Sequence, residues 1–288
     1  NGGAASWRVL KQGRPRVVKL LDNFGDAQAI RALLPNVTIV GRVYLAEQPQ
    51  QGDPRAAAQR WLDAYAATIR AARDVDYWEG YNEPALGTVA QASWLAAFDA
   101  ARAELLASIG ARASVLNAAT GTPDVNNATL VEALYPALDA ALKYGGVLGL
   151  HEYGAPYMNA TFAGTACGGQ GWLCGRYRKL YSQYLVPTKR VVPLVISETG
   201  IDCGTCAVTG CHCTGGWKGA CSSGELGVPT AQCAAAYMRT LAWYDAVLRC
   251  DAYVVGATVF SLEIANWDSF DIAPLVPQLV QHLQQSKT

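Results

Sequence analysis

Short runs of apolar and β-branched residues alternate along the chain with longer alanine-rich segments, in which apolar residues recur every three to four positions. The short runs have the length and composition of β-strands that are buried on both faces. Because strands that alternate with helices form parallel sheets covered by those helices, the pattern predicts an α/β fold. The predicted strands are Val17–Leu21, Thr38–Tyr44, Tyr77–Tyr81, Ser114–Asn117, Val147–His151, Leu194–Ser197 and Val254–Phe260.

The intervening segments carry helix signals. Asp53 followed by Pro54 is a typical helix start, with an N-cap residue and a proline in the first turn. The helix predicted from there to about Arg73 places Trp61 and Leu62 on its apolar face. Further helices are predicted over Gln91–Ile109, Leu130–Tyr144, Arg176–Leu185 and Thr230–Leu248, with a short one over residues 4–12 that ends at Gly13.

Length and continuity favour a single large domain. The 288 residues contain no linker or low-complexity tract, and 51% of them are hydrophobic. An α/β barrel needs about 250 residues, so we predict one (β/α)8 TIM barrel over residues 1–288. The pattern supplies seven strands where such a barrel has eight. Two explanations are open: the first strand lies upstream of Asn1, or another segment of the chain supplies a strand that the pattern does not show.

Two glutamates stand at the ends of predicted strands. Glu83 belongs to the segment Trp78–Pro84, Trp-Glu-Gly-Tyr-Asn-Glu-Pro, and Glu198 follows the strand that ends at Ser197. Catalytic groups of parallel barrels sit at the carboxyl ends of the strands. Cleavage of a glycosidic bond needs two carboxyl groups, one on each side of that bond. The alternative is that each glutamate is an ordinary loop or helix-capping carboxylate.

The pattern Trp78-Glu79-x-x-Asn82-Glu83-Pro84, followed by a second strand-end glutamate, resembles the signature of the clan A retaining glycoside hydrolases. The resemblance follows the order of nearly the whole chain and assigns no individual family. It implies that Glu83 is the general acid/base, that Glu198 is the nucleophile, and that Asn82 hydrogen-bonds the sugar 2-hydroxyl group. It also implies a β-linked poly- or oligosaccharide substrate. We expect an endo-acting β-glucanase, with a mannanase, a xylanase, a galactanase or a non-catalytic carbohydrate-binding barrel as alternatives.

Other positions follow from the same resemblance. His151 and Tyr153 end the predicted strand before that of Glu198, where such enzymes often place a residue beside the nucleophile. Trp267 resembles the aromatic floor of the sugar site, and Arg42 is placed to keep a carboxylate ionised. The alternatives are a core histidine, a core aromatic residue and an interior ion pair. Asn117, at the end of another strand, is expected to be structural.

Glu79 and Lys19 lie within predicted strands, below the expected rim of the barrel. A carboxylate inside a barrel requires a cation as partner. We therefore predict a structural ion pair between them rather than a catalytic role.

Charge excludes some partners. Lys+Arg and Asp+Glu both number 23, and no basic run occurs, which argues against nucleic acid and anionic membranes. No apolar run of about 18 residues, the length of a membrane span, is present. We expect a monomer that requires no metal or organic cofactor.

All nine cysteines lie at or after Cys167, which favours disulfides in a secreted, extracellular protein. Cys167 and Cys174 look like a local pair, and Cys250 like an odd free thiol. The cluster that contains His212 could instead bind zinc, because short cysteine spacings with a histidine can give four ligands. Since the cluster directly follows Glu198, we expect it to form a long loop over the rim. The cluster is Cys203, Cys206, Cys211, Cys213 and Cys221.

Overall fold

Seven parallel strands form the central sheet of the computed structural model, which describes residues 2–286. Their order in the sheet is β1-β2-β3-β4-β5-β8-β9, so each strand pairs with the strand of this sheet that comes next along the chain. All seven predicted strands are confirmed, with ends that differ by a few residues. The strands are β1 (Val17–Leu21), β2 (Thr38–Arg42), β3 (Tyr77–Glu79), β4 (Ala113–Ala118), β5 (Val147–Gly154), β8 (Leu194–Ile201) and β9 (Val254–Val259).

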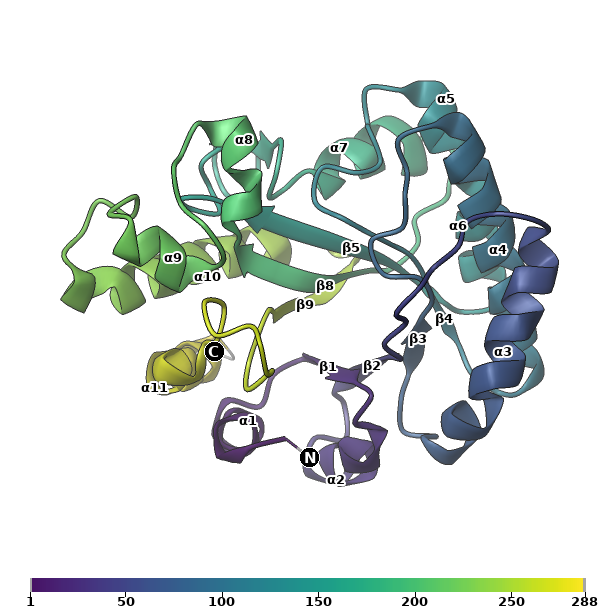
Figure 1. The fold of residues 1–288 in the computed structure, drawn as a ribbon, viewed down its shortest axis with the longest axis horizontal. Helices are drawn as coiled ribbons and strands as arrows, with labels where there is room; N and C mark the ends of the chain where they lie inside the picture. The colour runs from purple at the N-terminus through teal and green to yellow at the C-terminus, as the bar shows by residue number, and fades with distance from the viewer. Residues whose placement is uncertain (1, 287–288) are drawn as a thin grey trace.

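The sheet curls into a nearly closed barrel with helices outside it (Figure 1), which confirms the predicted fold class. Its two edge strands approach each other: a Cβ atom added to Gly256 of β9 would lie 2.6 Å from Cγ2 of Val17 in β1. No hydrogen-bonded ladder joins these two edges. Within residues 2–286 no eighth strand joins this sheet, so the explanation in which another segment supplies it is wrong for these residues. The upstream strand stays a prediction.

The helices follow the predicted segments closely. The Asp53 carboxylate accepts a hydrogen bond of 2.6 Å from the Ala56 amide, which is the predicted N-cap of α3 (Pro54–Ala71). A capping box of Thr88 and Gln91 starts α4 (Val89–Ser108) two residues before the predicted start. The helix predicted over Leu130–Tyr144 is divided into α5 (Ala128–Glu132) and α6 (Tyr135–Lys143). Pro136 lies in the first turn of α6, because a proline is tolerated in the first turn of a helix but not in its interior.

The remaining helices complete the outer layer and the loops. None of the helices within residues 2–286 is long and apolar enough to cross a bilayer. They are α1 (Ala4–Arg8), α2 (Ala27–Leu33), α7 (Tyr177–Leu180), α8 (Cys206–Thr209), α9 (Trp217–Ser222), α10 (Cys233–Arg249) and α11 (Val276–Gln285). Wider turns continue α1 over Val9–Gly13 and α7 over Tyr181–Leu185, and a two-stranded hairpin, β6 (Phe162–Ala163) and β7 (Gln170–Gly171), lies between β5 and α7.

The barrel interior is layered. One buried cluster is built from Val17, Val40, Val147 and Val195, with Tyr77 packed against it. Side chains two positions apart in a strand point to the same face, so the next layer toward the carboxyl ends is set by the residues that follow these by two positions. Three of those residues are charged, namely Lys19, Arg42 and Glu79. The barrel interior therefore has a layer of valines and, next to it toward the carboxyl ends of the strands, a layer that contains these three charged residues.

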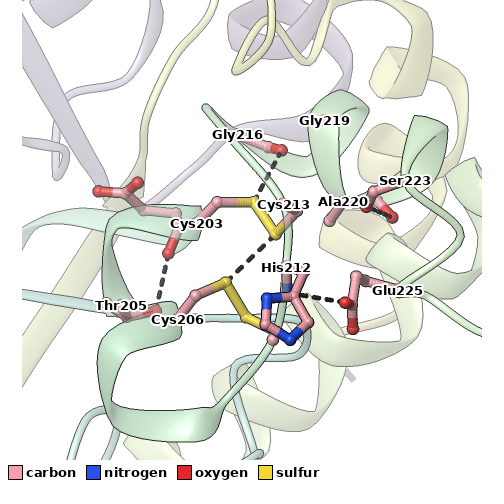
Figure 2. The surroundings of a disulfide bond; sticks show 12 residues. Cys203, Thr205, Cys206, His212, Cys213, Gly216, Gly219, Ala220, Ser223 and Glu225 are labelled. Carbon is pink, nitrogen blue, oxygen red and sulfur yellow. Dashed lines mark hydrogen bonds between the residues drawn. A yellow bond between two sulfur atoms is a disulfide. The ribbon is translucent and has the colours of Figure 1, made fainter.

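The cysteines of the long loop after β8 pair as disulfides, as the favoured interpretation predicted (Figure 2). The pairs are Cys203–Cys213, Cys206–Cys211 and Cys221–Cys233. Disulfide formation removes the thiolates that a zinc site would need. Together with α8 and α9, these bonds hold a loop that projects beyond the end of β8 (Figure 1).

Two of the cysteine predictions are wrong. Cys167 pairs with Cys250, while Cys174 is the free cysteine and is buried. The guanidinium of Arg178 explains the pairing, because it donates to the carbonyls of Ala166 and Gly169 at 2.6 and 2.7 Å. It also contacts the Asp251 carboxylate at 2.7 Å. This single side chain therefore draws the loop that carries Cys167 against the end of α10.

Candidate active site

The two strand-end glutamates lie close together. Glu198 is within β8, and its side chain is 10% exposed, whereas Glu83 follows β3 and is 40% exposed. One oxygen of each carboxylate and one ring nitrogen of His151 all lie within 4.8 Å of one another. The fold therefore brings together three residues that the sequence separates by up to 115 positions, 198 minus 83.

The backbone of Glu83 is held in an unusual conformation. Its φ angle is 48°, in the left-handed region that residues with side chains seldom adopt. The Glu83 amide donates to the carbonyl of Asn117 at 3.0 Å, and Asn117 itself has a φ of 44°. The Asn117 side chain is buried and hydrogen-bonded to Ser114, so it serves the structural role that was expected. Strain of this kind collects at functional sites.

Two cations contact one oxygen of Glu198. Lys19 Nζ lies 2.9 Å and Arg42 Nη1 lies 3.1 Å from Glu198 Oε1. Burial by itself raises the pKa of the Glu198 carboxyl, but Lys19, His151 and Arg42 together outweigh burial and lower it to about 2. Glu198 is therefore an anion at any pH near neutrality, with Arg42 in the position that the sequence predicted.

The other oxygen of Glu198 faces two strand-end residues of β5. The Tyr153 hydroxyl donates to Glu198 Oε2 at 2.9 Å, and His151 Nδ1 lies 3.6 Å from the same oxygen. Burial, and then the Glu198 charge, raise the pKa of Tyr153 well above its usual range, so its phenol stays protonated as a donor. His151 Nδ1 also lies 2.8 Å from Glu83 Oε1 and so bridges the two carboxylates.

The predicted ion pair between Lys19 and Glu79 is present, at 2.9 Å. Both side chains are nearly inaccessible, with 11% and 0% exposure. Because Lys19 also contacts Glu198, the pair does more than neutralise Glu79. The Lys19 ammonium group contacts Glu79 and Glu198 at the same time. The sequence did not indicate this second contact.

Asn82 is fixed through its backbone. The Gln48 side chain accepts from the Asn82 amide and donates to its carbonyl, the latter at 3.0 Å. The side-chain oxygen of Asn82 is buried and has no hydrogen-bond partner among residues 2–286. A buried polar atom without a partner is uncommon, and this one lies next in the chain to Glu83. That position is compatible with the substrate contact expected for it.

Trp267 is 47% exposed and lies after β9. Its ring packs edge-on against Phe260, with centroids 5.1 Å apart, and against Phe270 at 5.4 Å. Phe260 in turn packs against Tyr153 at 6.5 Å. The aromatic side of the site is therefore a row that starts at Tyr153, and Phe260 lies between it and the predicted Trp267.

Sequence reasoning missed three contributors to this site. Gln48 and Phe260 have no distinctive pattern around them. Asp202 follows β8, and burial, with a further contribution from the nearby Glu83 charge, raises the pKa of its carboxyl. Nothing in the local sequence separates Asp202 from an ordinary loop aspartate; its position beside the site depends on the course of the loop after β8.

Fold and site together define a (β/α)8-type barrel with a closely spaced carboxylate pair at the carboxyl ends of its strands.

No family model and no curated protein matches the chain. Among solved structures, the chain is similar to a β-glucuronidase from an uncultured Clostridium sp., with 10% identity and a TM-score of 0.53. This match covers 98% of this chain and 46% of that one, so the chain spans less than half of that protein's length. An endo-β-1,4-mannanase from Thermotoga petrophila matches with 10% identity and a TM-score of 0.49, over 98% and 73% of the two chains. At such identity the likeness to the glucuronidase is one of fold, and it supports the barrel.

Proposed function

We propose that the protein is a retaining glycoside hydrolase. The observation that carries this proposal is the distance between the two carboxylates, whose nearest oxygens lie within 4.8 Å of each other. Retaining enzymes keep their carboxyl groups about 5–5.5 Å apart, whereas inverting enzymes leave about 6.5–9.5 Å for a water molecule. The spacing therefore favours direct attack by one carboxylate on the sugar.

The surroundings of the two glutamates assign their roles. Glu198 is the nucleophile, because two cations keep it ionised and the Tyr153 hydroxyl orients its second oxygen. Glu83 is the acid/base: it is the more exposed carboxylate, and its oxygen contacts His151 rather than a permanent cation. In the first step Glu83 gives a proton to the departing glycosidic oxygen while Glu198 bonds to the anomeric carbon. In the second step Glu83 takes a proton from a water molecule while the oxygen of that water bonds to the anomeric carbon. The bond between this carbon and Glu198 breaks, which releases the sugar and regenerates the Glu198 carboxylate.

The substrate we propose is a neutral β-linked poly- or oligosaccharide cut within the chain, with a β-glucan as first choice. A net charge of zero fits a neutral polymer. Mannans, xylans and galactans are the further candidates. The four disulfides fit an extracellular protein. We further propose that it acts as a monomer without a metal or organic cofactor.

The test is a product screen against β-glucans, mannans, xylans and galactans, with Glu83→Gln and Glu198→Gln alongside. Glu132→Gln is the matched control, because Glu132 is an exposed residue of α5. We expect sugar release by the wild type and the control, and a loss of roughly 10³-fold or more in Glu198→Gln, because covalent catalysis disappears. Proton NMR of the first product reports its anomeric configuration. A product with inverted configuration, or turnover that persists in Glu198→Gln, would contradict the mechanism. Tight glycan binding with no release by the wild type would instead indicate a carbohydrate-binding barrel.

A further inference from the structure

The loop after β8 brings two disulfides into contact with each other. They are Cys203–Cys213 and Cys206–Cys211. The sulfur atoms of Cys206 and Cys213, which belong to different disulfides, are only 3.4 Å apart (Figure 2). The Cys203 sulfur lies within 4.8 Å of both, and the Cys211 sulfur is bonded to that of Cys206. Among residues 2–286, no other such group consists of cysteines alone.

The separation of these sulfur atoms is close to that in a zinc site. Zn²⁺ binds four thiolates in a tetrahedron at about 2.3 Å, which places the sulfur atoms about 3.8 Å from one another. The 3.4 Å contact between Cys206 and Cys213 is slightly shorter than that separation, and the 4.8 Å limit that includes Cys203 is longer. Once both disulfides are opened, rotation of the four side chains is therefore enough to surround one ion.

Backbone hydrogen bonds close this loop independently of the disulfides. The Cys203 amide donates to the Gly215 carbonyl at 2.8 Å, which joins the two ends of the loop. Gly210 has a φ of 77°, and its amide donates to the Cys206 carbonyl at 2.7 Å, so the chain turns back after α8. Because these contacts involve no sulfur, reduction leaves them in place, and the four thiols stay near one another.

The surroundings of the cluster suit thiolate ligands. Cys203 and Cys211 are 5% and 9% exposed, so water is largely excluded from them. The Thr209 hydroxyl donates to the Cys211 sulfur at 3.3 Å, and hydrogen bonds to a ligand atom help to hold a metal site. His212 is exposed, its amide donates to the Glu225 carboxylate (Figure 2), and its ring is not part of the group within 4.8 Å. The ligand set is therefore sulfur alone.

We propose that the reduced form of this cluster binds one Zn²⁺ ion through Cys203, Cys206, Cys211 and Cys213. A dithiol reductant opens each disulfide: its own two sulfur atoms join as a disulfide, and its two thiol hydrogens pass to the cysteine sulfurs. Zn²⁺ then replaces the four thiol protons, which leave to solvent. The loop thus has two closed forms, one held by disulfides and one held by zinc. The ion is structural, and the inference does not depend on the proposed function.

Zinc binding by the full chain tests the proposal. The reductant is a trialkylphosphine, which takes the oxygen of a water molecule while the two hydrogens of that water pass to the sulfurs of a disulfide. Competition with a chromogenic chelator then measures the affinity for zinc. We expect one Zn²⁺ per reduced chain with a Kd below about 100 nM, and at least about 10³-fold weaker binding by the oxidised protein. Co²⁺ in place of Zn²⁺ should show the sulfur-to-metal charge-transfer absorption of four thiolates.

Paired serine variants locate the ion. Cys206→Ser combined with Cys211→Ser should bind zinc at least about 10³-fold more weakly, because two of the four ligands are lost. Cys221→Ser combined with Cys233→Ser is the matched control, since it removes a neighbouring disulfide outside the cluster, and it should bind as the wild type does. His212→Ala should also bind zinc as the wild type does.

Four results would overturn the proposal. They are an absence of tight zinc binding by the reduced wild type, wild-type affinity without Cys206 and Cys211, a loss of affinity in His212→Ala, and tight binding by a reduced chain that has lost its fold. Far-UV dichroism with and without zinc reports the fold. The cobalt spectrum counts the thiolates in the wild type, so it decides the ligand set even if the paired variants do not fold.

Discussion

Glu152 lies on β5 but faces the helices outside the barrel, where only 2% of it is exposed. Its carboxylate accepts hydrogen bonds from the amides of Gly175 and Tyr177, at 2.5 and 2.8 Å, and from the Tyr244 hydroxyl at 2.5 Å. Burial raises the pKa of Glu152 from 4.5 to about 7, although these donors and the Arg176 charge act in the opposite direction. The protein thus contains a carboxyl group that holds its proton well above the usual range.

The pKa difference sets a magnitude for stability. Each pKa unit corresponds to about 1.4 kcal/mol, so the rise from 4.5 to about 7 amounts to about 3 kcal/mol. In the unfolded chain the carboxyl ionises near pH 4.5, while in the folded protein it keeps its proton until about pH 7. Its contribution to stability is therefore complete below pH 4.5 and is lost as the pH rises through 7. Glu152→Gln carries no ionisable group and should lose this dependence.

The assay is denaturant unfolding of both proteins at pH 5 and pH 8. Wild-type protein should lose about 2 to 3 kcal/mol more than Glu152→Gln between these values, since most of the difference falls within this interval. All other titrating groups are common to both proteins and cancel. Glu132→Gln, on the exposed face of α5, should behave as the wild type does. Equal pH dependence in wild type and Glu152→Gln would refute the reasoning.

Three further predictions concern the site and the disulfide between Cys167 and Cys250. Lys19→Met removes a cation 2.9 Å from Glu198, so the pKa of Glu198 should rise and the acid limb of the pH profile of kcat/KM should move to higher pH. Tyr153→Phe removes a hydrogen bond to a charged group and should lower kcat/KM roughly 10- to 100-fold in steady-state kinetics, with unchanged far-UV dichroism. Replacement of Cys167 and Cys250 by serine opens a link between residues 83 positions apart. It should cost up to about 4 kcal/mol of stability, seen as a lower Tm, while the serine variant keeps its product pattern.

The strand pattern was predictable because the barrel strands are buried on both faces. Such strands are continuous apolar runs, and seven of them could be located within a few residues. The rule that active groups follow parallel strands then selected Glu83 and Glu198. Both steps use information that lies within about ten residues of each position. The ion pair of Lys19 and Glu79 followed from the same local reasoning about interior positions.

The cysteine pairing shows where local reasoning ends. Cys167 and Cys174 are near each other in the sequence, yet the structure joins Cys167 to Cys250 and leaves Cys174 in the core. The decisive contact is made by Arg178, whose partners lie on both the hairpin loop and the end of α10. No spacing rule contains that information.

By itself, the sequence determined which segments are strands and helices, which two glutamates stand at strand ends, and that a cation must meet Glu79. Only the tertiary structure decided that the two carboxylates approach within 4.8 Å and that the Lys19 ammonium group contacts both Glu79 and Glu198. The physical reason is that periodicity and capping act over a few residues. Distances between strand ends instead depend on the order, register and curvature of the whole sheet, and ionisation depends on the charges that this sheet brings together.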